Sequence, residues 1–459
     1  MSAAVELLFS ATLAGYALIN YRSDDDVIDI FTDVSDPVGD SRSVSRNANR
    51  LAIDGGTPVR VGLSPPWPFF ADDEIAAAVS VLKSGKVNQW TGSQVWDFEK
   101  EFADRFPGHT AVAVANGSIA LEAALKALGI GPGDEVIVPA RSFLASASSV
   151  SLVGAKPVFA DVDFDTQVIT PATIEPLIGP ATRAILPVHL SGRPCDMPAI
   201  MQLAQSHGLL VIEDCAQSLG AYIAGRPTGV FGHAAAFSFC QDKIITSGGE
   251  GGMVLTANED VSRKVWSWKD HGKSFEIAFG PPQAAGYRWM YESFGTNGRM
   301  TEMQAAIGRC QLRKLDRWVA ARIANAERLA SALSRHACAR LVPVPADQIH
   351  SYYRLDITID ASSLRPGWSR DRIIAALQAE GIPASVGTCP EIYREAVYAR
   401  SAQYERLPNA ERLGRETVLL LVHPTMTTQY IEECERAIEK VFGAADAKDR
   451  AIGSRANRA

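Results

Sequence analysis

Seven short apolar runs alternate with stretches of helical periodicity between residues 111 and 256. In chain order they are AVAVA (111–115), EVIVP (135–139), PVFAD (157–161), AILPV (184–188), LLVIED (209–214), AAFSF (235–239) and MVLT (253–256). Strands that alternate with helices predict an α/β fold, a mainly parallel sheet with helices on both faces. Ligands bind such sheets beyond the carboxyl ends of the strands, so chemistry is expected there.

The 459 residues divide into a folded unit and two tails. Apolar residues recur at intervals of three and four from Thr301 to Leu333, which predicts one long helix leading into a smaller α+β domain. The predicted segments are a poorly ordered extension (1–50), a large domain (51–315) whose first part (51–80) can pack as an arm on the small domain, the small domain (316–442) and a disordered tail (443–459).

Composition excludes several classes of protein. Lys and Arg total 45 against 52 Asp and Glu, and a net charge of −7 argues against a nucleic-acid partner. The seven cysteines form no Cys-x-x-Cys pair and no cluster with histidine, which predicts a cytoplasmic chain with neither a disulfide framework nor a metal site. Residues 3–21 are largely apolar but lack a basic flank before Arg22, so membrane association is expected only if they act as an anchor.

Two ionisable residues follow predicted strands. Asp214 ends the run LLVIED, where a carboxylate faces the ligand side of the sheet, although an aspartate there could also cap the next helix. Lys243 follows AAFSF and precedes a glycine-rich segment. A lysine partly shielded from water at a strand end loses its proton more readily and can bond a carbonyl compound covalently, whereas the simpler alternative is a surface lysine.

Four further residues are suited to a planar, phosphorylated ligand. Gly117 and Ser118 open a helix directly after a strand, where backbone N–H groups and a hydroxyl bind anions, and Ser238 could add a second hydroxyl. Phe143 follows the second strand and could stack on a flat ring. Each feature also has an ordinary structural explanation, as helix caps or core packing, but their order along the chain is that expected of a pyridoxal phosphate site.

The chain also resembles the pyridoxal-phosphate-dependent sugar aminotransferases of the DegT/StrS family. The resemblance spans residues 53–426 and rests on NGSIALEAAL, GDEVIVPARSF, GAKPVFADVD, VIEDCAQSLGA, FSFCQDKIITSGGEGG and GTNGRMTEMQAAIGRCQL. It implies the aspartate-aminotransferase fold (pyridoxal phosphate fold type I), in which helices sandwich a seven-stranded sheet.

The resemblance implies a role for each matching residue. Lys243 matches the lysine that bonds the cofactor, and Asp214 the carboxylate at its pyridine nitrogen. The other implied cofactor contacts are Gln217 at the ring hydroxyl, Phe143 stacked on the ring, and Gly117, Ser118 and Ser238 at the phosphate. Asn297 matches an asparagine that reaches the neighbouring subunit's phosphate, which implies a homodimer with shared active sites.

The implied reaction moves an amino group from glutamate or glutamine to a ketone on a nucleotide-linked sugar, for polysaccharide or secondary-metabolite synthesis. A ketocyclitol acceptor is the alternative, and a non-catalytic binding or regulatory protein is a remote one. Arg299 is a candidate for the acceptor's diphosphate. His189 is a weaker candidate for substrate contact, because a histidine near a strand end is more often structural.

Overall fold

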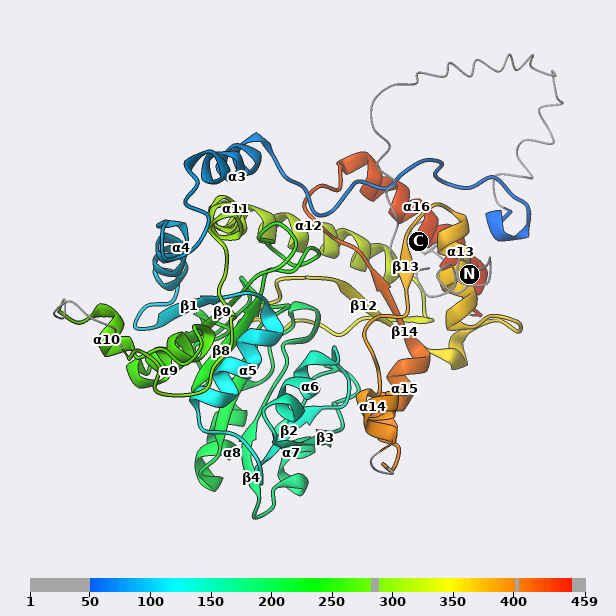
Figure 1. Ribbon diagram of the computed structural model, residues 1–459. Helices are drawn as coiled ribbons and strands as arrows, with labels where there is room; N and C mark the ends of the chain where they lie inside the picture. Colours follow the sequence, from blue (N-terminus) through cyan, green and yellow to red (C-terminus); the bar gives the residue numbers. More distant parts are fainter. Residues whose placement is uncertain (1–49, 282–288, 401–403, 448–459) are drawn as a thin grey trace, which may run out of the picture.

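A seven-stranded sheet forms the centre of the computed structural model, which describes residues 50–281, 289–400 and 404–447 (Figure 1). In spatial order its strands are β1 (Thr110–Val114), β9 (Gly252–Thr256), β8 (Ala234–Ser238), β5 (Leu210–Asp214), β4 (Thr182–Ile185), β2 (Glu135–Pro139) and β3 (Lys156–Ala160). The five strands from β8 to β3 pair in parallel, whereas β9 runs antiparallel to both of its neighbours. The predicted mainly parallel α/β sheet is confirmed.

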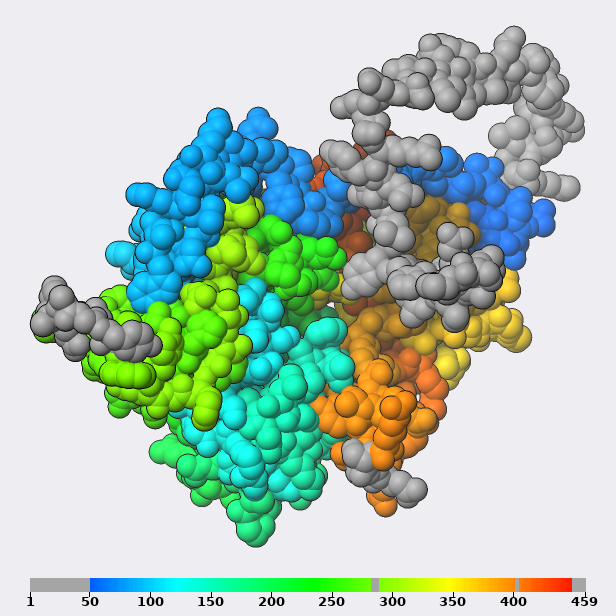
Figure 2. Space-filling view, viewed as in Figure 1, coloured from blue at the N-terminus to red at the C-terminus, as the bar shows by residue number. Residues whose placement is uncertain are grey.

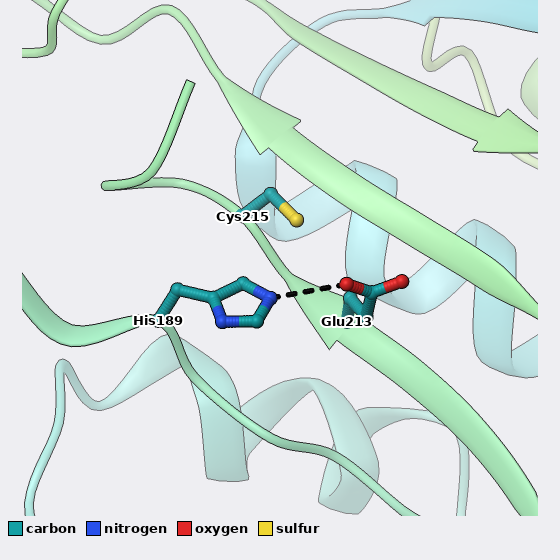
Figure 3. A group of neighbouring side chains, drawn as sticks. All are labelled: His189, Glu213 and Cys215. Carbon is teal, nitrogen blue, oxygen red and sulfur yellow. Dashed lines mark hydrogen bonds and ion pairs between the residues drawn. The ribbon is translucent and has the colours of Figure 1, made fainter. Parts of the chain in front are cut away.

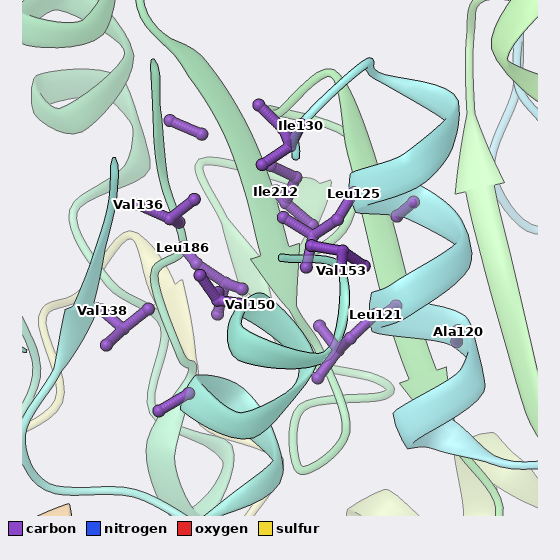
Figure 4. Packing of buried hydrophobic residues seen from close by; sticks show 14 of the residues in the cluster. Ala120, Leu121, Leu125, Ile130, Val136, Val138, Val150, Val153, Leu186 and Ile212 are labelled. Atoms are coloured by element: carbon purple, nitrogen blue, oxygen red, sulfur yellow. The ribbon is translucent and has the colours of Figure 1, made fainter. Parts of the chain in front are cut away.

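Helices cover both faces of this sheet because successive side chains of a strand point to opposite sides. Val136 and Val138 of β2 join one core with the helices α5 (Gly117–Ala127), α6 (Ala145–Leu152) and α9 (Glu259–Lys269), whereas Ile137 joins another with α8 (Met197–His207). Figure 4 shows the first of these cores. Phe98 and Phe102 place α4 (Gln94–Ala103) over the opposite face near β8 and β9.

The smaller domain has its own sheet and core. Its antiparallel strands are, in spatial order, β10 (Ala339–Arg340), β12 (Leu355–Ile359), β14 (Thr417–Leu420) and β13 (Ala384–Ser385). They pack against α13 (Arg370–Ala379), α16 (Thr428–Ala445) and the end of α12 (Leu315–Leu333). A short ribbon of β11 (Gln348–Ile349), β6 (Tyr222–Ile223) and β7 (Arg226–Pro227) pairs the segment before β12 with the large domain.

The remaining elements are short or peripheral. They are the helices α3 (Asp72–Ser84), α7 (Pro171–Ile174), α10 (Phe275–Phe279), α11 (Glu302–Leu312), α14 (Ala396–Ala399) and α15 (Pro408–Glu416), and the 3-10 turns η1 (Ala52–Asp54), η2 (Glu175–Leu177), η3 (Leu190–Gly192), η4 (Ala361–Ser363) and η5 (Ile392–Arg394).

Residues 51–70 form an arm that crosses the molecule, whereas the rest of the expected arm 51–80 belongs mostly to α3, which packs on α11. Leu51 is buried in the small-domain core, and the backbone N–H groups of Ala52 and Val59 donate to Glu380 at 2.8 and 2.9 Å. Arg60 pairs with Glu433 of α16 at 2.6 Å. Figure 2 shows the arm in blue along the upper edge of the molecule, between the α3 region and the small domain.

The single helix expected over Thr301–Leu333 is wrong, because the chain forms α11 and α12 with a break at Arg313 and Lys314. The Lys314 ammonium reaches back to Asp73 and Glu74 of α3 at 2.7 and 2.6 Å. Since α11 packs on α3 and α4 whereas α12 packs on α16, the two segments follow different partner surfaces. The periodicity of apolar residues in the sequence does not indicate this change of packing partner between α11 and α12.

The boundary at residue 442 is also wrong. Helix α16 continues to Ala445, which is fully buried, and Asp446 is buried beside Leu364, with which it forms an isolated β-bridge. The apolar contacts of Ala445 extend the small-domain core past the expected end. The expectations for residues 1–49 and 448–459, including the apolar stretch 3–21, lie outside the described residues. Within the described ranges, no helix combines the length and apolar character that crossing a membrane requires.

Candidate active site

The carboxyl ends of β5 and β8, which are neighbours in the sheet, bring the predicted residues together. Asp214 is the last residue of β5, Ser238 is the last of β8, and Lys243 follows five residues later. The turn after β1 adds Gly117 at the start of α5, and the chain after β2 adds Phe143. Residues separated by 100 positions in sequence therefore share one edge of the sheet, as parallel topology requires.

Asp214 is buried and held by two hydrogen bonds. Its oxygens accept the Ser146 hydroxyl at 2.8 Å and the Ala216 N–H at 3.1 Å. Burial raises the pKa of Asp214, and the two hydrogen bonds and the nearby Lys243 ammonium oppose that effect. A carboxylate with increased proton affinity is a strong acceptor for a cationic N–H group. Ser146 was not predicted, because nothing in the sequence distinguishes it from the other three serines of α6.

The start of α5 and the end of β8 form a close contact. A Cβ atom added to Gly117 would lie 2.6 Å from Cβ of Ser238, so only glycine permits this approach. Asn116 caps α5 by accepting the Ile119 N–H at 2.9 Å, and Gly117 and Ser118 supply the first N–H groups of the helix. Helix starts carry partial positive charge. The Gly117 contact therefore brings the Ser238 hydroxyl, near that of Ser118, to a position where an anion can bind.

Lys243 is half-buried in the turn after β8. Its Nζ atom lies 4.7 Å from the centre of the Tyr353 ring, which comes from the segment leading into the small-domain strand β12. The adjacent Asp242 accepts hydrogen bonds from the Tyr353 hydroxyl and from Arg354. Tyr353 and Arg354 were missed in the sequence, since nothing in a single chain indicates that residues 110 positions apart meet.

Phe143 and Gln217 lie on the same ligand side of the sheet. The Phe143 ring is 65% exposed, which leaves it open for stacking on a planar ligand. The Gln217 side-chain oxygen accepts the Ser191 N–H at 2.7 Å. Because the oxygen is engaged, the NH₂ end of the amide is the one available to donate to a ligand.

His189 does not present its ring to a ligand. It is fully buried, its Nε2 atom lies 3.1 Å from Glu213, and its Nδ1 atom accepts the Cys195 N–H at 3.0 Å (Figure 3). Its two ring nitrogens are therefore committed within the fold. These contacts favour the structural interpretation of His189.

His189, Glu213 and Cys215 have the spacing of a metal site, but the polar atoms are already used. The Glu213 oxygens accept the N–H groups of Gly229, Phe231 and Gly232 at 2.7–2.8 Å in addition to the histidine. Burial raises the pKa of the Cys215 thiol well above its usual value, so it remains protonated. A protonated thiol and a saturated carboxylate are poor metal ligands.

Replacing Glu213 by glutamine is expected to destabilise the protein by about 3–5 kcal/mol, because an amide NH₂ would face buried N–H donors. Burial raises the carboxyl pKa of Glu213, but the His189 and backbone hydrogen bonds outweigh it and leave the pKa below 4.5. Because the folded-state pKa is lowered, the ionised Glu213 side chain stabilises the protein above pH 4.5. That stabilisation is lost as the pH falls through the folded-state pKa.

Thermal unfolding between about pH 7 and pH 3 measures both effects. Wild-type protein is expected to lose part of its stability at the acid end, whereas Glu213→Gln lacks that component. The exposed Glu259, which pairs with Arg263 on the surface of α9, provides the control, and Glu259→Gln should change stability by less than about 0.5 kcal/mol. Equal Tm values for the two variants would contradict the structural role.

Arg299 and Asn297 belong to a separate group around Asp270. Arg299 donates to Asp270 at 2.7 Å, Lys273 lies 3.4 Å from the same oxygen, and the Trp90 indole donates to the other oxygen at 2.8 Å. Asn297 is exposed and forms an isolated β-bridge with Asp270. Within one subunit, these contacts tie both residues to Asp270 rather than to Asp214 or Lys243.

Comparisons with known proteins identify the family of this chain. The chain is 38% identical over 354 residues to a UDP-N-acetyl-3-dehydro-alpha-D-glucosamine 3-aminotransferase of Acidithiobacillus ferrooxidans, which covers 76% of this chain and 89% of that protein. It is 36% identical to an L-glutamine:2-deoxy-scyllo-inosose aminotransferase of Streptomyces kanamyceticus, covering 80% and 88% of the two chains.

A solved aminotransferase structure from Psychrobacter cryohalolentis is 46% identical, with a TM-score of 0.81 over 83% of this chain and 99% of that one. Residues 69–441, which include every predicted site residue, match the pattern of one family. The chain is thus an aminotransferase and belongs to the DegT/DnrJ/EryC1/StrS aminotransferase family.

Proposed function

We propose that this aminotransferase uses pyridoxal phosphate to move an amino group from glutamate or glutamine to the ketone of a nucleotide-linked sugar. The observation that carries the proposal is the convergence of Asp214 and Lys243 at the ends of neighbouring strands, beside the Gly117–Ser238 contact. That edge of the sheet combines an acid, an amine and an anion-binding turn, which together suit a phosphorylated, cationic ring.

The family implies pyridoxal phosphate, and the residues present fit it. The close approach that Gly117 permits places the Ser238 hydroxyl beside the start of α5, which suits a phosphate, and Phe143 is exposed for stacking. Asp214 is the buried acceptor for a protonated pyridine nitrogen, and Gln217 can donate to the ring hydroxyl. When bound, pyridoxal phosphate supplies a ring that accepts the electrons released at the carbon bearing the amine.

The chain's own residues then orient the reactants and move the proton. Asp214 would hold a proton on a pyridine nitrogen, since among the described residues its carboxylate accepts hydrogen bonds from the neutral donors Ser146 and Ala216. Lys243 acts as the general base that takes a proton from the donor's α-carbon. It then acts as the general acid that delivers a proton to the acceptor carbon receiving the amino group. Tyr353 shields the lysine side chain from water on one face.

The acceptor assignment rests on the relatives. One relative's name specifies a UDP-linked keto-sugar, and the other's specifies a scyllo-inosose, so a ketocyclitol remains the second candidate. A non-catalytic role is disfavoured, since it does not require Lys243 and Asp214 at the same edge of the sheet. All seven cysteines are free thiols, which supports a reducing cytoplasm as the compartment.

We also propose a homodimer in which Asn297 reaches the partner's phosphate site and Arg299 contacts the acceptor's diphosphate. Asn297 lies on an exposed loop beside Tyr291 and Phe294, whose side chains are 60% and 102% exposed. Large apolar side chains gathered on an exposed loop are typical of protein–protein interfaces. A partner covering this loop would bring it next to a second active site.

An acceptor panel tests the proposed function. Protein loaded with pyridoxal phosphate is mixed with glutamate or glutamine, and the visible absorption of the bound cofactor should decrease. Nucleotide-linked keto-sugars that differ in base and ketone position, together with scyllo-inosose, are then added, and mass spectrometry detects the amino product. Amination of a nucleotide sugar supports the proposal, whereas exclusive amination of the inosose favours the ketocyclitol alternative.

A further inference from the structure

The indole of Trp67 lies against the turn that carries Lys243. Its Nε1–H group donates to the backbone carbonyl oxygens of Lys243 at 3.1 Å and of Asp242 at 3.3 Å. Trp67 belongs to the N-terminal arm, and a contact across 176 positions connects that arm with the candidate catalytic lysine. Gln311 of α11 strengthens the connection, since it accepts the Thr246 N–H of the same turn and donates to Phe69 of the arm.

The Trp67 ring is held by three surrounding side chains. The Trp318 ring meets it edge-on with centres 5.2 Å apart, the His423 ring stacks on it at 6.0 Å, and the Arg322 guanidinium lies 4.8 Å from its centre. Burial lowers the pKa of His423 to about 3, so this imidazole is neutral and does not repel Arg322. The indole orientation is therefore set by both the large and the small domain.

The small domain holds the same turn from the other side. Arg354 donates to the Asp242 carboxylate at 2.8 Å, and the Tyr353 hydroxyl binds the same oxygen. The Tyr353 ring faces Lys243 Nζ. Trp67 thus fixes the backbone of the turn, while Tyr353 and Arg354 fix its acidic side chain.

We propose that Trp67 is a positioning residue for Lys243, acting through its indole N–H on the backbone of the turn. Proton transfer requires the lysine nitrogen to lie within hydrogen-bond reach of the reacting carbon, and small displacements reduce the rate steeply. The hydrogen bond restricts the main chain on which the lysine side chain pivots. The inference rests on the proposed catalytic role of Lys243 but not on the identity of the acceptor.

Trp67→Phe tests this role because phenylalanine keeps an aromatic ring for the stacking contacts and removes the N–H group together with the five-membered ring, a loss that the control variant shares. The matched control is Trp96→Phe, since the half-buried Trp96 indole donates to the Gln89 carbonyl at 3.2 Å, on α4 away from the turn. Two quantities are measured: the single-turnover rate with glutamate or glutamine, and hydrogen–deuterium exchange of residues 240–250 in cofactor-free protein.

In Trp67→Phe we expect the single-turnover rate to fall about 3- to 10-fold, the range of one net hydrogen bond, with the half-saturating donor concentration unchanged. Exchange should increase in residues 240–250 and remain at the wild-type level in α5 and α8. Trp96→Phe should leave both quantities unchanged. Trp67→Leu, which also removes the aromatic ring, should show a larger loss of rate. If Trp67→Leu does not fold, the result for Trp67→Phe decides the question.

Three results for Trp67→Phe would overturn the inference. The first is a single-turnover rate equal to that of Trp96→Phe, and the second is a changed half-saturating donor concentration with an unchanged rate. The third is faster hydrogen–deuterium exchange throughout the chain. Lys243→Ala is measured in parallel. If that variant retains the half-reaction, the catalytic assignment of Lys243 fails. If it is inactive while Trp67→Phe behaves like the control, only the positioning role of Trp67 fails.

Discussion

Lys243→Ala is expected to abolish the amino-group transfer, with a loss of about 10⁴-fold or more, because the proposed function assigns to this one residue both the bond to the cofactor and the proton transfer. General acid–base catalysis alone accounts for about 10²–10⁴ of that factor. The measurement is the rate at which glutamate or glutamine removes the visible absorption of the bound cofactor. The variant should also fail to retain cofactor after borohydride treatment and denaturation, as judged by intact mass.

Lys156→Ala serves as the control, since Lys156 forms an exposed pair with Glu135 at the amino ends of the strands. Full activity in Lys243→Ala would remove the basis of the mechanism.

The same variant tests the shared site: mixed with inactive Asn297→Ala subunits, it should recover activity, because one hybrid site carries both wild-type residues. Two variants that stay inactive after subunit exchange would contradict the contribution of Asn297 to the partner's site.

Asp214→Asn is expected to lower the transfer rate by about 10²–10³-fold, the usual cost of removing one preorganised electrostatic contact. Asparagine has nearly the same shape as aspartate: its oxygen can still accept the Ala216 N–H, and its NH₂ group can donate to the Ser146 hydroxyl, which then acts as the acceptor. What is lost is the negative charge that keeps a pyridine nitrogen protonated.

The same substitution should not destabilise the cofactor-free protein. Burial raises the folded-state pKa of Asp214 above 3.8. The protonated side chain therefore stabilises the fold at low pH, and this contribution is lost as the pH rises through the folded-state pKa. At neutral pH the buried carboxylate is therefore only partly compensated by its hydrogen bonds, and Asp214→Asn should raise the Tm of cofactor-free protein or leave it unchanged. A lower Tm would show that Asp214 acts mainly as a structural cap.

Asp196→Asn provides a matched control, because Asp196 caps α8 by accepting the Ala199 N–H at 3.2 Å. Asparagine is an equally good cap, so neither rate nor Tm should change appreciably. The combination of lower activity with unchanged or greater stability is characteristic of a group placed for chemistry rather than for folding.

The local pattern of the sequence determined much of this architecture. Runs such as EVIVP and LLVIED predict buried strands because a strand covered on both faces must be apolar throughout. The alternation with helices predicts the parallel sheet, and the position of Asp214 at a strand end then predicts on which edge it lies. These inferences require only short-range information, which a single chain contains.

Contacts between distant segments were decided only by the tertiary structure. The helix breaks at Arg313 and Lys314 where the partner surface changes, and Lys314 pairs there with Asp73 and Glu74, which no periodicity within Thr301–Leu333 contains. Ser146 meets Asp214 only after α6 packs against the sheet. His189 was a candidate for substrate contact until its ring was found between Glu213 and the Cys195 N–H.

The sequence by itself determined the strands, the strand-end acid and lysine and, through its motifs, the family. The tertiary structure decided what surrounds them: Trp67 from the arm and Tyr353 from the small domain meet at the Lys243 turn. Such contacts depend on the packing of whole elements, whose free energy is distributed over many apolar side chains rather than encoded near any one residue. For that reason the candidate catalytic groups could be named from the sequence, whereas the residues that contact the Lys243 turn could not.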